Sequence, residues 1–383
     1  MITGMKVLDF SRYLPGPYAS LRLAEWGAEV VKVETKPFGD PARKMEPLYQ
    51  HTGAIHLACN HGKKSLLVDL KKEEGLHLIH RLLKKADVVI ESYRPGVADQ
   101  MGIGYQLAKE LNPQVVYCSL SGYGQEGTLK HMGGHDINYM ALSGILHGTI
   151  GEAGIPRVPD VTVADLAGGM AAAEAILAAY IHRLKTGEGS YLDISLVDAL
   201  LSWQGVNTMM SIAKEGETSL GEELRKAVSY QIYQTKDGRF MALGALEEKF
   251  WVGFCRSVGK EGWITYHQSP AIPGDPIYEE VKALFQSHDF AYWSRLAGEV
   301  DACLTPVLTR TEALNSPMAK ERKLFGTVSF QNQNLSVVHA IPRQETADIP
   351  SIAKLGEHSE EILKSWLEMD DRELELCKQK GMI

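Results

Sequence analysis

Two short segments carry residue types that suit acid/base chemistry. His135 and Asp136 stand side by side in the glycine-rich stretch Gly134-His135-Asp136-Ile137-Asn138-Tyr139, and Asp165 follows at the expected start of an alanine-rich helix. An imidazole and a carboxylate are two acid/base groups of different type, as proton transfer at carbon between two bases requires. An imidazole normally titrates near a pH of about 6.5, which suits this chemistry at neutral pH. The two segments therefore predict proton transfer at carbon.

The segment around His135 is expected to be an extended loop. Adjacent residues of an extended chain point to opposite sides, so His135 and Asp136 would each find a separate partner. An enolate-forming reaction also needs hydrogen-bond donors near the developing negative charge. The backbone N–H groups of Gly133 and Gly134, and those at the following helix start, are candidates for this role.

Asp165 has two interpretations. Aspartate commonly caps the first backbone N–H groups of a helix, which is a structural role. The start of a helix is also a place where the dipole favours a reactive carboxylate. Gly168 and Gly169 follow inside the expected helix, and adjacent glycines are useful there only where something approaches the backbone closely. This favours the functional interpretation, with a ligand near the helix start.

Further charged residues extend the candidate site. Glu247 precedes an expected helix, where it either complements the helix dipole or orients His135 if a smaller domain closes on a larger one. Basic residues also flank expected strand ends, where α/β sheets bind their ligands. Each of them alone fits a solvated surface equally well, and as a group they predict a site for phosphate groups: Lys36, Lys63, Lys64 and Arg94.

The elements that would position these residues alternate between strand and helix. Strands are expected at 6–10, 29–34, 65–70, 87–91, 115–119 and 191–195, and helices at 18–26, 72–84, 165–184 and 196–213. This succession predicts a parallel sheet with right-handed crossovers, and thus an α/β fold with a Rossmann-like, doubly wound large domain. No GxGxxG follows the first strand, where Pro15-Gly16-Pro17 stands instead. A nicotinamide-dependent dehydrogenase is therefore disfavoured.

The remainder of the chain predicts a second, smaller α+β domain. We expect the large domain over 1–213, a polar linker over 214–228, the small domain over 229–310 and a C-terminal segment over 311–383 that returns to the large domain. The small domain should contain a hairpin of 230–233 and 240–244, with helices at 247–257, 276–286 and 290–298. The chain is expected to end in one amphipathic helix at 357–380.

Composition excludes several classes of protein. The chain has 383 residues, 44% of them hydrophobic, and a net charge of −8, which allows a large core and argues against a nucleic-acid partner. Five cysteines without a CxxC argue against a disulfide framework. No metal site is predicted. The candidate ligands are His51, His56, Cys59 and His61, and their spacing matches no common zinc-binding pattern. With no apolar leader and no run of about twenty apolar residues, we predict a cytoplasmic protein without a membrane partner.

Nearly the whole chain resembles the class III CoA-transferase family, the CaiB/BaiF group. The resemblance is carried by several segments, among them Val7-Leu8-Asp9 with Pro15-Gly16-Pro17-Tyr18, Gly27-Ala28-Glu29-Val30-Val31-Lys32-Val33-Glu34, Arg94-Pro95-Gly96, Ser121-Gly122-Tyr123-Gly124 and Gly187-Glu188-Gly189. It implies an acyl-CoA substrate and no cofactor beyond the CoA moiety. It also implies an interlaced homodimer, with CoA on the large domain and the active site near the partner subunit's small domain.

The resemblance also implies roles for the candidate residues, because the family includes two chemistries. Its transferases use an aspartate as a nucleophile that passes CoA through anhydride and thioester intermediates, and Asp165 matches that aspartate. Its α-methylacyl-CoA racemases use the same aspartate as one base and a histidine, matched by His135, as the other. Glu247 matches the small-domain glutamate that pairs with this histidine, and Asp136 matches the carboxylate that pairs with the aspartate.

Three hypotheses follow. The first is epimerisation of 2-methylacyl-CoA thioesters by 1,1-proton transfer through an enolate, with Asp165 and His135 on opposite sides of Cα. The second is transfer of CoA between an acyl-CoA and a carboxylate through an aspartyl-CoA thioester on Asp165. The third, a non-catalytic CoA-binding protein, is disfavoured because all the candidate residues are present. Leu166-Ala167 stand where the racemases carry an aromatic residue and a third glycine, a difference that bears on the acyl pocket.

Overall fold

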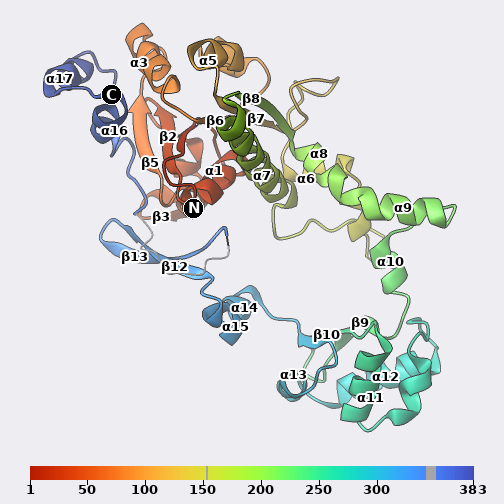
Figure 1. Cartoon of the computed structure of the whole chain (residues 1–383). Coiled ribbons are helices and arrows are strands. Elements are labelled where there is room, and N and C mark those ends of the chain that lie inside the picture. The colour runs from red at the N-terminus through yellow and green to blue at the C-terminus, as the bar shows by residue number, and fades with distance from the viewer. Residues whose placement is uncertain (152–153, 342–350) are drawn as a thin grey trace. The chain divides into compact units, whose positions relative to one another are not determined.

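The chain folds into two compact units (Figure 1). The computed structural model describes residues 1–151, 154–341 and 351–383. The first unit comprises Met1–Trp203 and Met318–Ile383, and the second comprises Gln204–Pro317. The division after Trp203 falls within the stretch 196–213, where one continuous helix was expected and two are found. Its first part, α8 (Leu196–Leu201), belongs to the first unit, and its second part, α9 (Gly205–Ala213), belongs to the second.

A six-stranded parallel sheet forms the centre of the first unit, in the order β5-β2-β1-β6-β7-β8. Counted along the chain, this is the 3-2-1-4-5-6 order of a doubly wound Rossmann sheet. The expected α/β fold is thus confirmed, and each strand lies within a residue or two of its predicted position. The strands are β1 (Lys6–Asp9), β2 (Glu29–Thr35), β5 (Lys64–Val68), β6 (Val88–Glu91), β7 (Val116–Ser121) and β8 (Ser190–Ser195).

Helices cover both faces of this sheet, because successive strand residues point to opposite sides. Val7 of β1 packs in a core with α1 (Pro15–Glu25), α7 (Val163–Thr186) and α8. Leu8, the next residue, packs in a second core with α3 (Glu73–Leu83), α5 (Tyr105–Leu111) and α16 (Ser359–Leu367). Strands buried on both faces account for the nearly continuous hydrophobic runs in the sequence.

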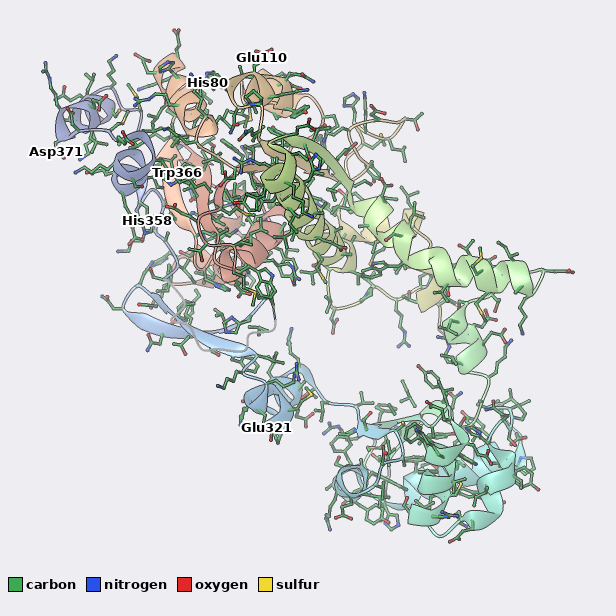
Figure 2. The ribbon with its side chains drawn as sticks, in the orientation of Figure 1. His80, Glu110, Glu321, His358, Trp366 and Asp371 are labelled. Atoms are coloured by element: carbon green, nitrogen blue, oxygen red, sulfur yellow. The ribbon has the colours of Figure 1, made fainter. Side chains whose placement is uncertain are left out.

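Of the C-terminal segment expected over 311–383, the part from Met318 belongs to the first unit, and its end holds two helices where one was expected. Glu368 has a left-handed φ of 56°, which ends α16, and Asp370 caps α17 (Asp371–Gln379). Figure 2 shows His358 and Trp366 on this segment beside the sheet. The Ser65 N–H of β5 donates to Nδ1 of His358 at 3.3 Å, and the Trp366 side chain is buried in the core. These contacts attach the segment to the edge of the sheet.

The second unit has its own core around a three-stranded antiparallel sheet. Its strands are β9 (Tyr230–Gln234), β10 (Phe240–Gly244) and β11 (Leu304–Pro306). The expected hairpin and the three expected helices are confirmed, as β9–β10 and as α11 (Glu248–Ser257), α12 (Pro276–Ser287) and α13 (Phe290–Glu299). The stretch 214–228, which was expected to be a polar linker, contains the short helix α10 (Leu220–Leu224), which Ser219 caps.

Shorter elements complete the described chain. They are β3 (Leu48–Tyr49), β4 (Thr52–Gly53), α2 (Ala54–Cys59), α4 (Val97–Gln100), α6 (Asp136–Leu142), α14 (Arg310–Asn315), α15 (Pro317–Glu321) and the hairpin of β12 (Phe325–Phe330) and β13 (Gln333–Val338), with 3₁₀ turns at Pro41–Lys44, His147–Thr149, Ser202–Gln204 and Glu261–Tyr266. Among them, α6 carries the candidate acid/base segment. It packs in the same core as α7.

One helix of the described residues, α7, is long and apolar enough to cross a membrane when judged by length and composition alone. The sequence analysis did not identify it as such a run. The helix has 24 residues, and its most apolar window has a mean hydropathy of 1.3. Its buried residues, which include Ala172 and Ile176, pack against the parallel sheet. This packing accounts for the buried part of the helix, which is 44% of that window.

Candidate active site

Asp165 and Asp136 meet at the start of α7. Asp165 is the third residue of this helix, not its cap as expected, since the helix begins at Val163. The cap residue Thr162 makes no side-chain bond to the helix. Instead Oδ1 of Asp136, the first residue of α6, accepts hydrogen bonds from the N–H groups of Ala164 at 2.7 Å and Asp165 at 3.1 Å. Asp136 therefore caps α7 from a neighbouring helix.

This arrangement changes the acidity of Asp165. Burial, together with the negative charge of Asp136, raises the pKa of Asp165 from 3.8 to about 7. Two carboxyl groups held close together resist ionising at the same time, and Asp136 already occupies the donors at the helix start. A carboxyl group with a pKa near neutrality can both take up and release a proton at physiological pH. The geometry thus gives Asp165 the acidity of a general base.

His135 directly precedes α6, and its side chain is exposed in this chain. The expectation that the segment stays extended through Asp136 is wrong, because α6 begins at Asp136. Extended geometry ends at His135, with φ −131° and ψ 175°. The two residues nonetheless have different surroundings: Asp136 binds the start of α7, whereas the imidazole of His135 remains open to solvent or to a ligand. The segment thus brings one basic group and one capping group to adjoining positions.

Gly168 and Gly169 serve packing within the protein, which differs from the ligand approach that the sequence favoured. A Cβ on Gly168 would collide with the side chain of Leu196 at the start of α8. A Cβ on Gly169 would lie 2.7 Å from the carbonyl oxygen of Pro15 and 3.0 Å from the ring of Tyr18. Because side chains are absent here, α7 can lie against α1 and α8. The paired glycines therefore position the helix that carries Asp165.

Glu247 lies in the second unit, where it is the N-cap residue of α11 directly after β10. Its side chain is exposed. The geometry fits the structural interpretation, in which a glutamate complements the helix dipole. Since His135 belongs to the first unit, the pairing of Glu247 with His135 stays a prediction.

Lys63 does not lie where a phosphate-binding lysine was expected. Its side chain is 1% exposed, and its Nζ donates to Asp9 Oδ2 at 3.2 Å, Pro17 O at 2.8 Å, Ser20 Oγ at 2.7 Å and Asn60 Oδ1 at 2.9 Å. Burial lowers the pKa of Lys63 to about 8. The ammonium group is thus occupied inside the fold, where it supports the turn between β1 and α1.

The other three basic residues, Lys36, Lys64 and Arg94, differ in whether their charged groups are already bound by other parts of the protein. Lys64 forms ion pairs with Glu29 at 2.7 Å and Glu361 at 2.8 Å. Lys36 donates to main-chain oxygens at the C-terminus, those of Gly381 and Ile383. Arg94 is exposed and follows β6, next to β1, where the strand order of the sheet reverses and ligands of such sheets bind.

Arg94 also adjoins the acid/base segment. Its Nη2 atom lies 3.0 Å from the position that a Cβ on Gly133 would take. The guanidinium therefore lies beside the glycines that precede His135. Among the four basic candidates, Arg94 is the one whose position best suits a ligand at this site.

Two tyrosines belong to the site, although sequence reasoning gave them no role. Tyr139, in α6, is 8% exposed, and its ring meets that of Tyr123 edge-on with centroids 5.2 Å apart. Its hydroxyl donates to the carbonyl oxygen of Gly134 at 2.7 Å. Both residues stood in segments that carried the family resemblance, but nothing in their spacing indicated that β7 and α6 would bring them together.

No group of three or more His, Cys, Asp or Glu side chains within residues 1–151, 154–341 and 351–383 is arranged to hold a metal ion. His56, Cys59 and His61 are all buried. Burial lowers the pKa of His56 well below its usual value and raises that of the Cys59 thiol to about 11. These residues belong to the interior that surrounds Lys63.

Comparison with known proteins adds to this geometry. The model of CoA-transferase family III matches residues 2–359. The chain is 32% identical over 375 residues to the α-methylacyl-CoA racemase of Homo sapiens, covering 95% of this chain and 93% of that protein. It is 30% identical over 405 residues to the succinyl-CoA:glutarate CoA-transferase of Mus musculus, covering 100% of this chain and 90% of that protein.

Solved structures agree with this result. The chain superimposes on the crystal structure of a CaiB/BaiF family protein from Brucella suis with a TM-score of 0.80 and 27% identity, covering 94% of this chain and 97% of that one. The relatives include proteins named as racemases and proteins named as transferases, so the protein is an enzyme of one of these two kinds. Sequence, fold and relatives together show that the chain belongs to CoA-transferase family III.

Proposed function

We propose that the protein epimerises 2-methylacyl-CoA thioesters by a 1,1-proton transfer between two bases. The observation that carries this proposal is the carboxyl group of Asp165, whose pKa is raised to about 7 by burial and by Asp136. A base of this acidity suits the removal of a proton from carbon at neutral pH. The similarity to an α-methylacyl-CoA racemase over 95% of the chain adds support.

In this mechanism the carboxylate of Asp165 takes the proton α to the thioester carbonyl, and the electron pair of the broken C–H bond forms an enolate. His135, as an imidazolium, then donates a proton to the opposite face of the same carbon. The reverse reaction exchanges the two roles. Asp136 stays a capping group, because its Oδ1 atom accepts from two backbone N–H groups. Arg94, with Lys36 and Lys64, is proposed to bind the phosphates of CoA.

The second candidate function is CoA transfer, with Asp165 as the nucleophile. The similarity to a succinyl-CoA:glutarate CoA-transferase over the full chain favours it. It ranks second because it requires only Asp165 and gives His135 no necessary role, whereas proton transfer between two bases uses both residues.

The deciding experiment supplies one epimer of a 2-methylacyl-CoA in deuterated water and follows the α-hydrogen by NMR. We expect exchange together with epimerisation, and we expect Asp165→Ala and His135→Ala each to abolish epimerisation. Glu174→Ala is the matched control, because Glu174 is exposed on the same helix α7. Absence of exchange, combined with hydroxylamine trapping of an acyl-enzyme from succinyl-CoA, would replace the racemase with the transferase.

A further inference from the structure

We infer that Tyr139 is a positioning residue that holds the backbone carrying His135, an inference that rests on the function proposed above. The evidence is that two side chains of α6 form hydrogen bonds to the same peptide group, the one between Gly134 and His135. The hydroxyl of Tyr139 donates to the carbonyl oxygen of Gly134 at 2.7 Å. On the other side of the same peptide, the His135 N–H donates to Oδ1 of Asn138 at 3.0 Å.

Both polar groups of the Gly134–His135 peptide are therefore bound by side chains of one helix. A peptide group is planar, so holding its C=O and its N–H fixes the orientation of the whole unit. The Cα of His135 lies at one end of that unit, and the direction of its side chain follows from it. The imidazole is exposed in this chain. Its orientation therefore depends strongly on the position of the backbone to which it is attached.

The ring of Tyr139 is itself fixed by packing. It lies edge-on to Tyr123, with an interplanar angle of 73°, and is almost fully buried. It occupies the space that side chains would need at two glycines: a Cβ on Gly134 would lie 2.7 Å from its ring, and a Cβ on Gly122 would collide with it. The tyrosine thus joins the end of β7, the glycine segment and α6 in one close contact.

The hydroxyl of Tyr139 acts as a permanent donor and not as an acid or base. Burial, with further contributions from Tyr123, Asp165 and Asp136, raises the pKa of Tyr139 to about 12. The group therefore stays protonated wherever the enzyme works. Its role is to hold the peptide, while proton transfer is left to His135 and Asp165.

Asp165 belongs to another helix, α7, and the acceptor that binds its N–H is the Asp136 side chain, not the Gly134–His135 peptide that Tyr139 holds. Removing the Tyr139 hydroxyl should thus disturb one base and spare the other. In Tyr139→Phe, Asp165 should still remove the α-proton of the epimer on which it acts and return deuterium to the same face. Protonation of the opposite face by His135 should slow by about tenfold, because small displacements of reacting groups are costly.

The test measures α-hydrogen exchange and epimerisation in deuterated water for wild type, Tyr139→Phe and Tyr180→Phe, starting from each epimer. Tyr180→Phe is the matched control, since it removes a hydroxyl from α7. We expect the ratio of exchange to epimerisation to rise about tenfold only in Tyr139→Phe, and from only one epimer. An unchanged ratio, with both rates intact or both lowered equally, would overturn the inference.

A second readout does not depend on activity. Hydrogen–deuterium exchange of the His135 amide should be accelerated about fivefold in Tyr139→Phe and unchanged in Tyr180→Phe. If wild type lacked epimerisation, the proposed function would fail, while this measurement would still decide whether Tyr139 holds the peptide. Asn138→Ala, which releases the other half of the same peptide, provides a second variant if Tyr139→Phe proves unstable. Unaltered amide exchange in both variants would refute the role of α6.

Discussion

At the scale of single residues, Asp165 is a group whose acidity the fold changes strongly. Its backbone N–H belongs to a helix start, and its neighbour Asp136 binds that start from α6. The same contact that completes the helix cap also brings a negative charge close to Asp165. Burial is the main cause of the raised pKa of Asp165, and the carboxylate of Asp136 that caps α7 adds to it, so capping and acidity are linked.

This linkage predicts a pH-dependent effect of Asp165→Asn on stability. The folded-state pKa of Asp165 is about 7, above its usual value of 3.8, so the native protein holds this proton more tightly than the unfolded chain. Between these two pH values the native state gradually loses that advantage as pH rises. Asp165→Asn should therefore leave the unfolding free energy unchanged near pH 4 and raise it above pH 7. We expect an increase of about 1–2 kcal/mol, because solvent screens a partly exposed group and reduces the effect of its pKa shift.

Urea unfolding of wild type and Asp165→Asn between pH 4 and 8.5 measures this difference. Asp136→Asn serves as a companion variant, because it retains an acceptor for the two N–H groups of α7 while removing the negative charge. It should lower the pKa of Asp165 and reduce the pH dependence of wild type. A stability difference that is constant over the whole pH range would contradict the raised pKa.

At the scale of elements, the placement of α7 depends on residues without side chains. Gly169 lies against the backbone of Pro15, and Gly168 lies against Leu196. The buried ammonium group of Lys63 binds the first turns of α1, where it donates to Pro17 O and Ser20 Oγ. The helix that carries Asp165 thus packs on α1, whose first turns are bound by a buried lysine.

Gly169→Ala tests this placement. The added Cβ meets a carbonyl oxygen at 2.7 Å, and because backbone yields little, we expect a loss of about 1–3 kcal/mol in unfolding free energy. Activity should fall as well, since α7 carries Asp165. Gly298→Ala is the matched control, because its Cβ would meet nothing within 4 Å in helix α13; it should be neutral or stabilising. Equal effects of the two substitutions would rule out close packing at Gly169.

At the scale of the whole molecule, α9 presents apolar side chains that the single chain does not cover. None of its residues is buried in the single chain. Val206, Met209 and Ile212 recur along one side of the helix and are 58%, 60% and 63% exposed. Exposed apolar stripes of this kind mark interaction surfaces. Together with the family resemblance, this leads us to propose a homodimer.

The dimer can be tested by light scattering coupled to size exclusion. We expect wild type to have twice the chain mass of 42.3 kDa, and we expect Met209→Glu to shift the population toward monomer by at least about tenfold in dissociation constant, because it places a charge in an apolar contact. Glu217→Lys, at an exposed polar position, should leave the mass unchanged. A monomeric wild type would refute the proposal.

The sequence by itself determined the fold class and the chemical types present at the site. Hydrophobic runs of strand length alternating with helical periodicity predicted the six strands and the doubly wound sheet, because these patterns depend on which side chains must be buried. The segment at His135 and Asp136, and the carboxylate at Asp165, could be identified from residue type and local position. The hairpin of the second unit was predictable for the same reason.

What only the tertiary structure decided were contacts between segments distant in the chain. Contact between α6 and α7 determines the capping of α7 by Asp136 and contributes to the raised pKa of Asp165. The hydrogen bond from Tyr139 to Gly134 likewise depends on how α6 folds against the preceding glycines. The burial of Lys63 likewise depends on β1 and α1 closing over it. Sequence patterns report local preferences, whereas acidity and orientation are set by neighbours in space, and so the residues could be named before their roles could be assigned.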